Sequence, residues 1–168
     1  MTKIFAYCER GLNPAFWAEP LNAVSNAAFL IAAVLALMAW HRHGHDFSGN
    51  RNHGRTELAL VLLVGVIGVG SFLFHTFATR WAAVADVAPI GIFMIAYLGY
   101  ALRRFGGFGW ALTLGGLVLF LAAMGVADGI TCDGRPCLNG SMAYLPAFGA
   151  LEHFPPDLGR YPYPAWRK

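Results

Sequence analysis

Residues 58–77 read LALVLLVGVIGVGSFLFHTF, a run without Asp, Glu, Lys or Arg. A helix needs about 20 mainly apolar residues to cross the hydrocarbon core of a bilayer, and this run has that length. Comparable apolar runs occupy residues 21–40, 81–102 and 110–127, and a shorter one begins near residue 141 and ends at 151. We therefore predict an all-α fold, a polytopic membrane helix bundle with four transmembrane helices and a fragment of a fifth.

The composition supports this fold class. Of the 168 residues, 57% are hydrophobic and 12% are charged, whereas soluble domains carry about 25% charged residues. This excludes a cytosolic enzyme and a disordered chain, and three cysteines are too few for a secreted disulfide scaffold. The net charge is only +3, with basic residues standing singly or in pairs between apolar runs. We therefore expect no nucleic-acid partner.

The charged connections predict an orientation for this multi-pass membrane protein. The connections after the first and third apolar runs carry five arginines, and the opposite side carries four basic residues diluted by acidic ones. The positive-inside rule then places the N-terminus outside. Cys132 and Cys137 also fall outside, where a disulfide can form, and we favour a disulfide over a zinc site there.

The end of the chain differs in composition from the rest. Residues 152–168 read EHFPPDLGRYPYPAWRK, and the prolines in this segment prevent a helix. We predict a transmembrane domain over residues 1–151, incomplete at its end, and a disordered Pro-rich tail over 152–168. Two explanations stay open: a short re-entrant segment with a loop tail, or loss of the natural reading frame near Gly149.

Polar side chains inside the apolar runs gather at one membrane face. Neighbouring antiparallel helices bring the start of the first run, the end of the second and the start of the third to the same depth. Pairs four residues apart occupy one face of a helix, and two such pairs occur here. The polar residues concerned are Glu19, Asn22, Ser25 and Asn26 at the start of the first predicted helix, Ser71 and His75 near the end of the second, and Asp86 near the start of the third.

These residues have both a structural and a functional interpretation. Asn and Ser commonly form hydrogen bonds between membrane helices, and for Asn22, Ser25 and Asn26 both interpretations stay open. Ionisable groups inside a span are costly to bury and usually functional. For His75 and Asp86 we therefore favour a functional role.

Three motifs resemble the alkaline ceramidase family. The opening of that family is similar to YCE at 7–9 with FWAEPLNAVSN at 16–26. Its second-helix motif resembles GSFLFHT at 70–76, and its aspartate-proline motif resembles DVAP at 86–89. The motifs follow in the same order and spacing, and the resemblance extends from about residue 7 to 151. The family belongs to seven-helix membrane hydrolases that include the progestin and adipoQ receptors, which implies that this chain is C-terminally truncated or frame-shifted.

The resemblance implies a zinc-dependent hydrolase that cleaves the amide bond of ceramide-like lipids within the membrane. His75 would be a zinc ligand, and Ser71 would lie beside the metal to stabilise the oxyanion or orient water. Asp86 would be a partner of the metal site or a proton acceptor. Glu9 and Glu19 match acidic positions of the family's calcium site.

This sequence departs from the family pattern in two ways. The family supplies two further zinc histidines from an HxxxH pair on its last helix, and no later helix of this chain has such a pair. At the calcium site, Ala6 and Gly11 stand where eukaryotic members carry oxygen-bearing side chains. We therefore expect an impaired enzyme. The alternatives are a non-catalytic lipid-binding or receptor-like membrane protein and, ranked last, a small proton or solute carrier using His75 and Asp86.

Overall fold

The computed structural model describes residues 3–5, 7–42, 51–132, 135–136, 141–142 and 144–152. The chain forms two compact units, Met1–Gly106 and Gly107–Lys168. The sequence-predicted tail lies outside the described residues beyond Glu152. The helices are α1 (Pro20–Ser25), α2 (Ala27–Arg42), α3 (Arg51–Phe77), α4 (Arg80–Arg104), α5 (Trp110–Asp128) and α6 (Leu145–Glu152), and the strands are β1 (Thr131–Cys132) and β2 (Arg135–Pro136).

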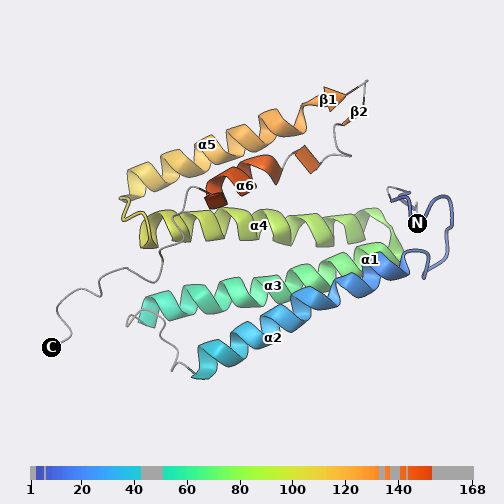
Figure 1. Ribbon diagram of the computed structural model, residues 1–168, viewed down its shortest axis with the longest axis horizontal. Helices are drawn as coiled ribbons and strands as arrows, with labels where there is room; N and C mark the ends of the chain where they lie inside the picture. The colour runs from blue at the N-terminus through green and yellow to red at the C-terminus, as the bar shows by residue number, and fades with distance from the viewer. Residues whose placement is uncertain are drawn as a thin grey trace. The chain divides into compact units, whose positions relative to one another are not determined.

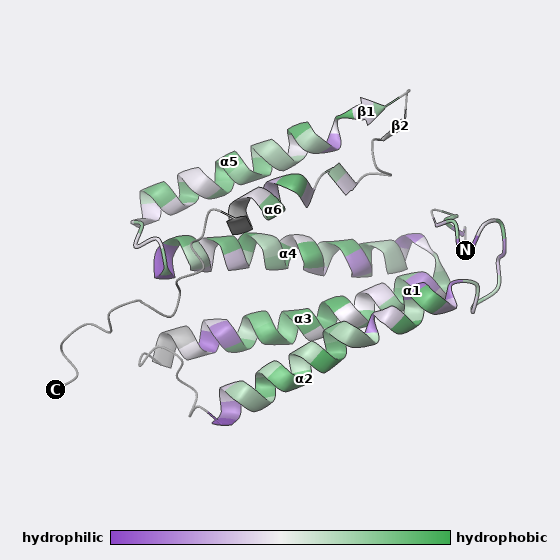
Figure 2. Ribbon diagram, in the orientation of Figure 1, coloured by the Kyte–Doolittle hydropathy of each residue, from purple (hydrophilic) through white to green (hydrophobic). Residues whose placement is uncertain are grey.

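The all-α bundle predicted from the sequence is confirmed. Four helical segments of the described residues are long and apolar enough to cross a membrane: Pro20–Arg42, Gly54–Phe77, Arg80–Arg104 and Trp110–Asp128. Figure 2 shows hydrophobic residues along the central lengths of α2 to α5 and hydrophilic residues mainly towards the helix ends. Leu35, Ile92 and Leu119 are more than half exposed although they lie mid-helix. Such exposed apolar surfaces suit lipid as the surrounding solvent, as expected of an integral membrane protein.

Helix α3 is the central element of the first unit. It packs against α2 on one side and α4 on the other, and it also contacts α1 (Figure 1). Because α2, α3 and α4 run antiparallel to their neighbours, the start of α1, the end of α3 and the start of α4 lie at one end of this unit.

The first apolar run is interrupted at Asn26, between α1 and α2. The Asn26 side-chain amide donates to the main-chain carbonyl of Asn22 at 2.8 Å, and the Ser25 hydroxyl donates to the same carbonyl at 2.9 Å. These side chains take the acceptor that the backbone of a continuous helix would use. The main-chain N–H of Phe29 bonds to the Asn26 carbonyl at 3.1 Å, a shorter-range bond that tightens the junction.

Glycines set the closest approaches of α3 to its neighbours. A Cβ on Gly68 would lie 2.9 Å from Phe29 Cβ in α2, and a Cβ on Gly70 would lie 2.0 Å from the Ala85 carbonyl oxygen in α4. Pro89 lies inside α4 and has no N–H to give to that carbonyl, four residues earlier. The carbonyl freed by Pro89 therefore faces Gly70, next to Ser71 and Asp86.

The connection between α3 and α4 is held by the N-terminal segment. Lys3 forms an antiparallel bridge with Thr79, and the N–H of Ile4 donates to the Ala78 carbonyl at 2.7 Å. Ala78 is 1% exposed and has φ +48°, a left-handed conformation that glycine adopts with less strain.

Substitution of Ala78 by valine is expected to lower the free energy of unfolding by about 2 kcal/mol or more, because a β-branched residue at positive φ is strained and overpacks a filled site. The matched variant Ala78→Gly relieves the strain but loses a buried methyl group, so its stability should remain within about 1 kcal/mol of the parent. Reversible unfolding in detergent, followed by circular dichroism, measures both. Equal stability of the two variants would contradict the strained geometry.

The second unit consists of α5, a short hairpin and α6. Thr131 and Cys132 of β1 pair antiparallel with Pro136 and Arg135 of β2, respectively, and α6 packs against α5. Cys132 is disulfide-bonded, as expected from the sequence, whereas the predicted partner Cys137 lies outside the described residues. The fifth, partial helix predicted from the sequence corresponds to α6.

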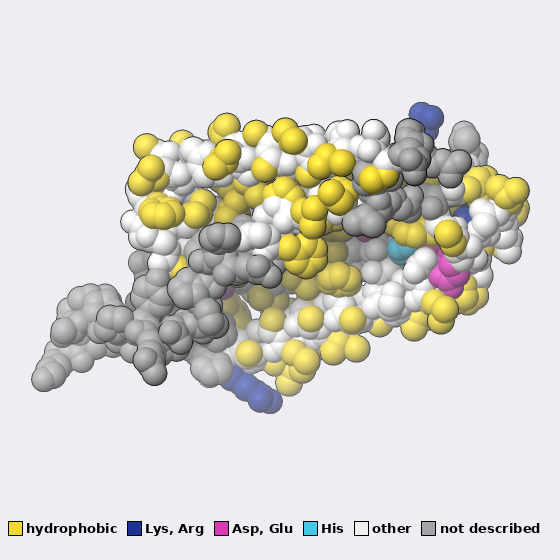
Figure 3. Space-filling model, turned by 45° about the horizontal axis from the view of Figure 1, so that its top comes forward, with side chains coloured by type: hydrophobic (Ala, Val, Ile, Leu, Met, Phe, Trp, Pro, Cys, Tyr) yellow, Lys and Arg dark blue, Asp and Glu magenta, His cyan; other side chains and the backbone are white. Residues whose placement is uncertain are grey.

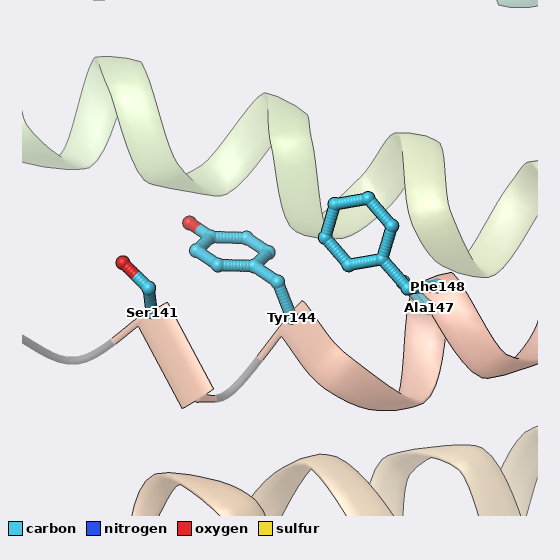
Figure 4. A pocket seen from close by; sticks show the side chains of 4 residues that line it. All are labelled: Ser141, Tyr144, Ala147 and Phe148. Atoms are coloured by element: carbon cyan, nitrogen blue, oxygen red, sulfur yellow. The ribbon is translucent and has the colours of Figure 1, made fainter. Parts of the chain in front are cut away.

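An apolar pocket of about 400 Å³ lies in the second unit and is lined by Ser141, Tyr144, Ala147 and Phe148 (Figure 4). The side chains of Ser141, Tyr144 and Phe148 extend from the same side of this segment. None of the sequence-predicted site residues lines it.

Candidate functional site

The candidate site lies at the end of the first unit where α1 starts, α3 ends and α4 starts. Of the predicted residues, Glu19, Asn26, Ser71, His75 and Asp86 are all buried. In Figure 3, acidic and histidine side chains are seen together at one end of the face in view, while hydrophobic side chains cover much of the remaining surface. The structure therefore places ionisable groups from distant parts of the sequence in one buried region.

The Glu19 carboxylate and the His75 imidazole are in direct contact. Glu19 precedes Pro20, the first residue of α1, and His75 lies in the last turn of α3. His75 Nδ1 is 2.6 Å from Glu19 Oε2. Because an ionised carboxylate only accepts hydrogen bonds, Nδ1 carries a proton, and in a neutral His75 ring the lone pair is then on Nε2. This is the arrangement by which proteins orient a histidine that binds a metal.

The protonation of Glu19 follows from its partners. Burial raises the pKa of Glu19, but hydrogen bonds from His75, Arg10 and Asn22 outweigh burial and hold the pKa below the usual range for glutamate. The carboxylate is therefore ionised at neutral pH, as the contact with His75 Nδ1 requires.

A second ionisable group, Asp86 of α4, lies beside Ser71 of α3. The Ser71 hydroxyl and the His75 imidazole are both near enough to the Asp86 carboxylate to interact with it electrostatically. Asp86 Oδ1 is buried and has no hydrogen-bond partner among the described residues. An unpartnered buried oxygen is costly, and this one is an available position for a proton, a water molecule or a metal ion.

Glu9 and the polar residues of α1 bond mainly to the backbone. The Glu9 carboxylate accepts the main-chain N–H groups of Leu21 at 2.7 Å and Asn22 at 3.0 Å, so it caps the start of α1. The Asn22 side chain also reaches Glu19 Oε2 at 3.4 Å, while the side chains of Ser25 and Asn26 bond to the Asn22 carbonyl. For Ser25 and Asn26 these contacts favour the structural interpretation.

Two residues of the site were missed by the sequence analysis. Arg10 is buried, pairs with Glu19 and donates to the His75 main-chain carbonyl at 2.7 Å. The Tyr7 ring lies edge-on to His75, with ring centroids 4.8 Å apart. Both belong to the N-terminal segment, which has no helical periodicity to predict which side chains face the bundle, although Tyr7 falls within a motif quoted for the resemblance.

The residues present match only part of what a zinc ion would need. A catalytic zinc takes about three protein ligands and keeps an open position for water. His75 Nε2 suits one of these positions, and the unpartnered Asp86 Oδ1 suits a hydrogen bond beside the metal. Within the described part of the chain, no group of three or more His, Cys, Asp and Glu side chains is placed to hold a metal ion.

The two glutamates matched to calcium are engaged by protein donors. Both oxygens of Glu9 accept main-chain N–H groups, and the two oxygens of Glu19 face Arg10 and His75. A guanidinium cation already lies against Glu19, so these carboxylates do not form an open calcium site in this arrangement.

Comparison of this chain with known protein families, with curated proteins and with solved structures finds no match.

Proposed function

We propose that this chain is a membrane-embedded, zinc-dependent amide hydrolase of ceramide-like lipids, with impaired activity because its described residues supply only part of a zinc ligand set. One observation carries the proposal. Inside the apolar bundle, an imidazole with its tautomer fixed by Glu19 lies near Asp86, a carboxylate with an unpartnered buried oxygen. Burying both groups is costly, and a bound cation would offset that cost.

Each residue has a role that follows from its contacts. Glu19 orients the His75 ring through Nδ1, and His75 would hold the metal through Nε2. Asp86 would accept a proton from the attacking water, and Ser71, beside that carboxylate, would donate to a developing oxyanion. Zinc, when bound, supplies Lewis-acid activation. The apolar surroundings admit the lipid and exclude bulk water.

The proposal includes an orientation with the N-terminus outside. The arginines of the first and third connections support it through the positive-inside rule. The disulfide at Cys132 also supports it, because this orientation places the hairpin on the oxidising side of the membrane.

Zinc binding and lipid cleavage test the proposed function. The full chain, purified in detergent, is titrated with zinc, and fatty-acid release from a ceramide is followed by mass spectrometry. We expect His75→Ala and Asp86→Asn to weaken zinc binding at least about tenfold, since even the outer partners of a metal site contribute 10–100-fold. His41→Ala, an exposed histidine at the end of α2, is the matched control and should bind zinc as the parent does.

The outcomes separate the two functions considered. Zinc binding that does not depend on His75 would contradict the zinc site. A non-catalytic lipid-binding or receptor-like function is favoured by one observation, namely that Arg10, Glu19 and His75 already satisfy one another. Saturable ceramide binding without zinc and without fatty-acid release would establish that second function.

A further inference from the structure

The Arg10 guanidinium lies in a shell of oxygen atoms. The Arg10 side chain is fully buried, with 0% of its surface exposed. Its Nε donates to Glu19 Oε1, one terminal nitrogen donates to the Ala15 carbonyl at 2.8 Å, and the other donates to the His75 carbonyl at 2.7 Å. Longer contacts of 3.4 Å reach the carbonyls of Asn13 and Thr76. One cation therefore joins the N-terminal segment, the residue before α1 and the last turn of α3.

This set of partners is what a divalent cation would bind. Calcium takes carboxylate and main-chain carbonyl oxygens from several segments of a chain. The carbonyls of His75 and Thr76 lie at the C-terminal end of α3, where carbonyls lack helical partners and the helix dipole favours a positive charge. In this chain that charge is covalently attached, as the side chain of Arg10.

We propose that Arg10 is a built-in cation that replaces a metal ion at this junction and acts as the positioning residue for the Glu19–His75 pair. Arg10 holds Glu19 Oε1, and this leaves Oε2 directed at His75 Nδ1. The junction therefore needs no added divalent cation. None of this depends on zinc binding or amide hydrolysis, so the inference stands apart from the proposed function.

The planar guanidinium group of arginine is essential to this role. Three different nitrogens of Arg10 bond to three different oxygens, in directions fixed by the guanidinium plane. A lysine at the same position has one ammonium group on a flexible stem and cannot reach all three. We therefore expect Arg10→Lys to keep the charge but to lose the orientation of Glu19.

The experiment uses the full chain in detergent with ¹⁵N-labelled histidine. The ring nitrogens of His75 report which nitrogen is protonated, and thermal unfolding is measured in EDTA, in calcium and in millimolar ethylguanidinium. The parent should unfold at the same temperature in all three and show a protonated Nδ1. Arg10→Ala should lose the signal of a protonated His75 Nδ1, and calcium or ethylguanidinium should restore that signal. Either additive should also raise the unfolding temperature of Arg10→Ala, because a ligand that binds the folded state stabilises that state.

Two controls make the outcome decisive. Arg42→Ala removes an exposed arginine at the end of α2 and should respond like the parent. Calcium dependence of the parent, or an unchanged His75 signature in both Arg10→Ala and Arg10→Lys, would overturn the inference. If Arg10→Ala does not fold, the parent protein and the Arg10→Lys variant still test the proposal. Stabilisation of the parent by calcium relative to EDTA would contradict it. A protonated His75 Nδ1 in Arg10→Lys, as in the parent, would also contradict it.

Discussion

Replacement of Arg10 by alanine is expected to lower the free energy of unfolding by about 3–5 kcal/mol, the range for breaking a buried ion pair by removing one partner. The substitution leaves the Glu19 carboxylate, itself 2% exposed, without its cation. It also leaves the carbonyls of Ala15 and His75 without their donor. Unfolding of the detergent-solubilised protein by increasing fractions of a denaturing detergent, followed by circular dichroism, measures the loss.

The control for Arg10 is Arg42, which lies at the exposed end of α2. Arg42→Ala should change stability by no more than about 0.5 kcal/mol, as is usual for surface substitutions. The double variant R10A/E19Q should recover part of the loss, because it removes the uncompensated charge. If Arg10→Ala costs no more than Arg42→Ala, the buried network does not stabilise the fold.

The positions of the spanning helices could be predicted from the sequence to within a few residues at most ends. Hydropathy and length decide such helices, because every backbone group in lipid must be bonded internally. The third predicted span, 81–102, corresponds to α4, Arg80–Arg104. The second predicted span starts at residue 58, whereas α3 starts seven residues earlier, at Arg51. A helix can extend beyond the hydrocarbon core through polar residues that hydropathy does not register.

Specific contacts accompany this extension of α3. The Tyr100 hydroxyl of α4 donates to Glu57 at 2.7 Å, and the Trp40 indole of α2 donates to the Gly54 carbonyl at 3.0 Å. Each of these two contacts joins residues that are well separated in the sequence, so no local sequence pattern predicts it. The interruption at Asn26 was missed for a related reason, since apolar content does not show that two side chains compete for the Asn22 carbonyl.

The candidate site was predictable in part. The positions of Ser71, His75 and Asp86 along their predicted helices indicated that they would lie near one another, because antiparallel helices bring those positions to the same end of the bundle. It did not predict which carboxylate bonds to His75. Glu19 takes that place because Arg10 and the chain reversal before α1 direct it there, and an irregular segment has no periodicity from which this could be inferred. The metal-binding and catalytic roles of these residues stay predictions.

Replacement of Gly70 by alanine is expected to have an effect comparable to the loss of Arg10. The new Cβ would lie 2.0 Å from the Ala85 carbonyl oxygen and 2.8 Å from its carbon, and both are main-chain atoms that cannot rotate away. The helices α3 and α4 must therefore separate. Overpacking costs about 1–3 kcal/mol and occasionally more, and a clash with backbone should reach at least the upper end of that range.

Two glycine controls sharpen this prediction. A Cβ on Gly91, in the interior of α4, meets nothing within 4 Å, so Gly91→Ala should be neutral or stabilise the helix by up to about 1 kcal/mol. Gly68→Ala should fall between the two, because the Cβ would meet the side chains of Phe29 and Leu30 at 2.9 and 3.2 Å. Unfolding in detergent ranks the three variants.

The Gly70 variant also links packing to the site. Gly70 is adjacent to Ser71, and Ala85 is adjacent to Asp86, so separation of α3 from α4 pulls the serine hydroxyl away from the carboxylate. We expect spin labels placed on α3 and α4 to report a longer distance in Gly70→Ala and an unchanged one in Gly91→Ala. If Gly70→Ala keeps both the stability and the interhelical distance of the parent, close approach at Gly70 does not hold Ser71 against Asp86. The pair would then have to be positioned by the helix ends alone.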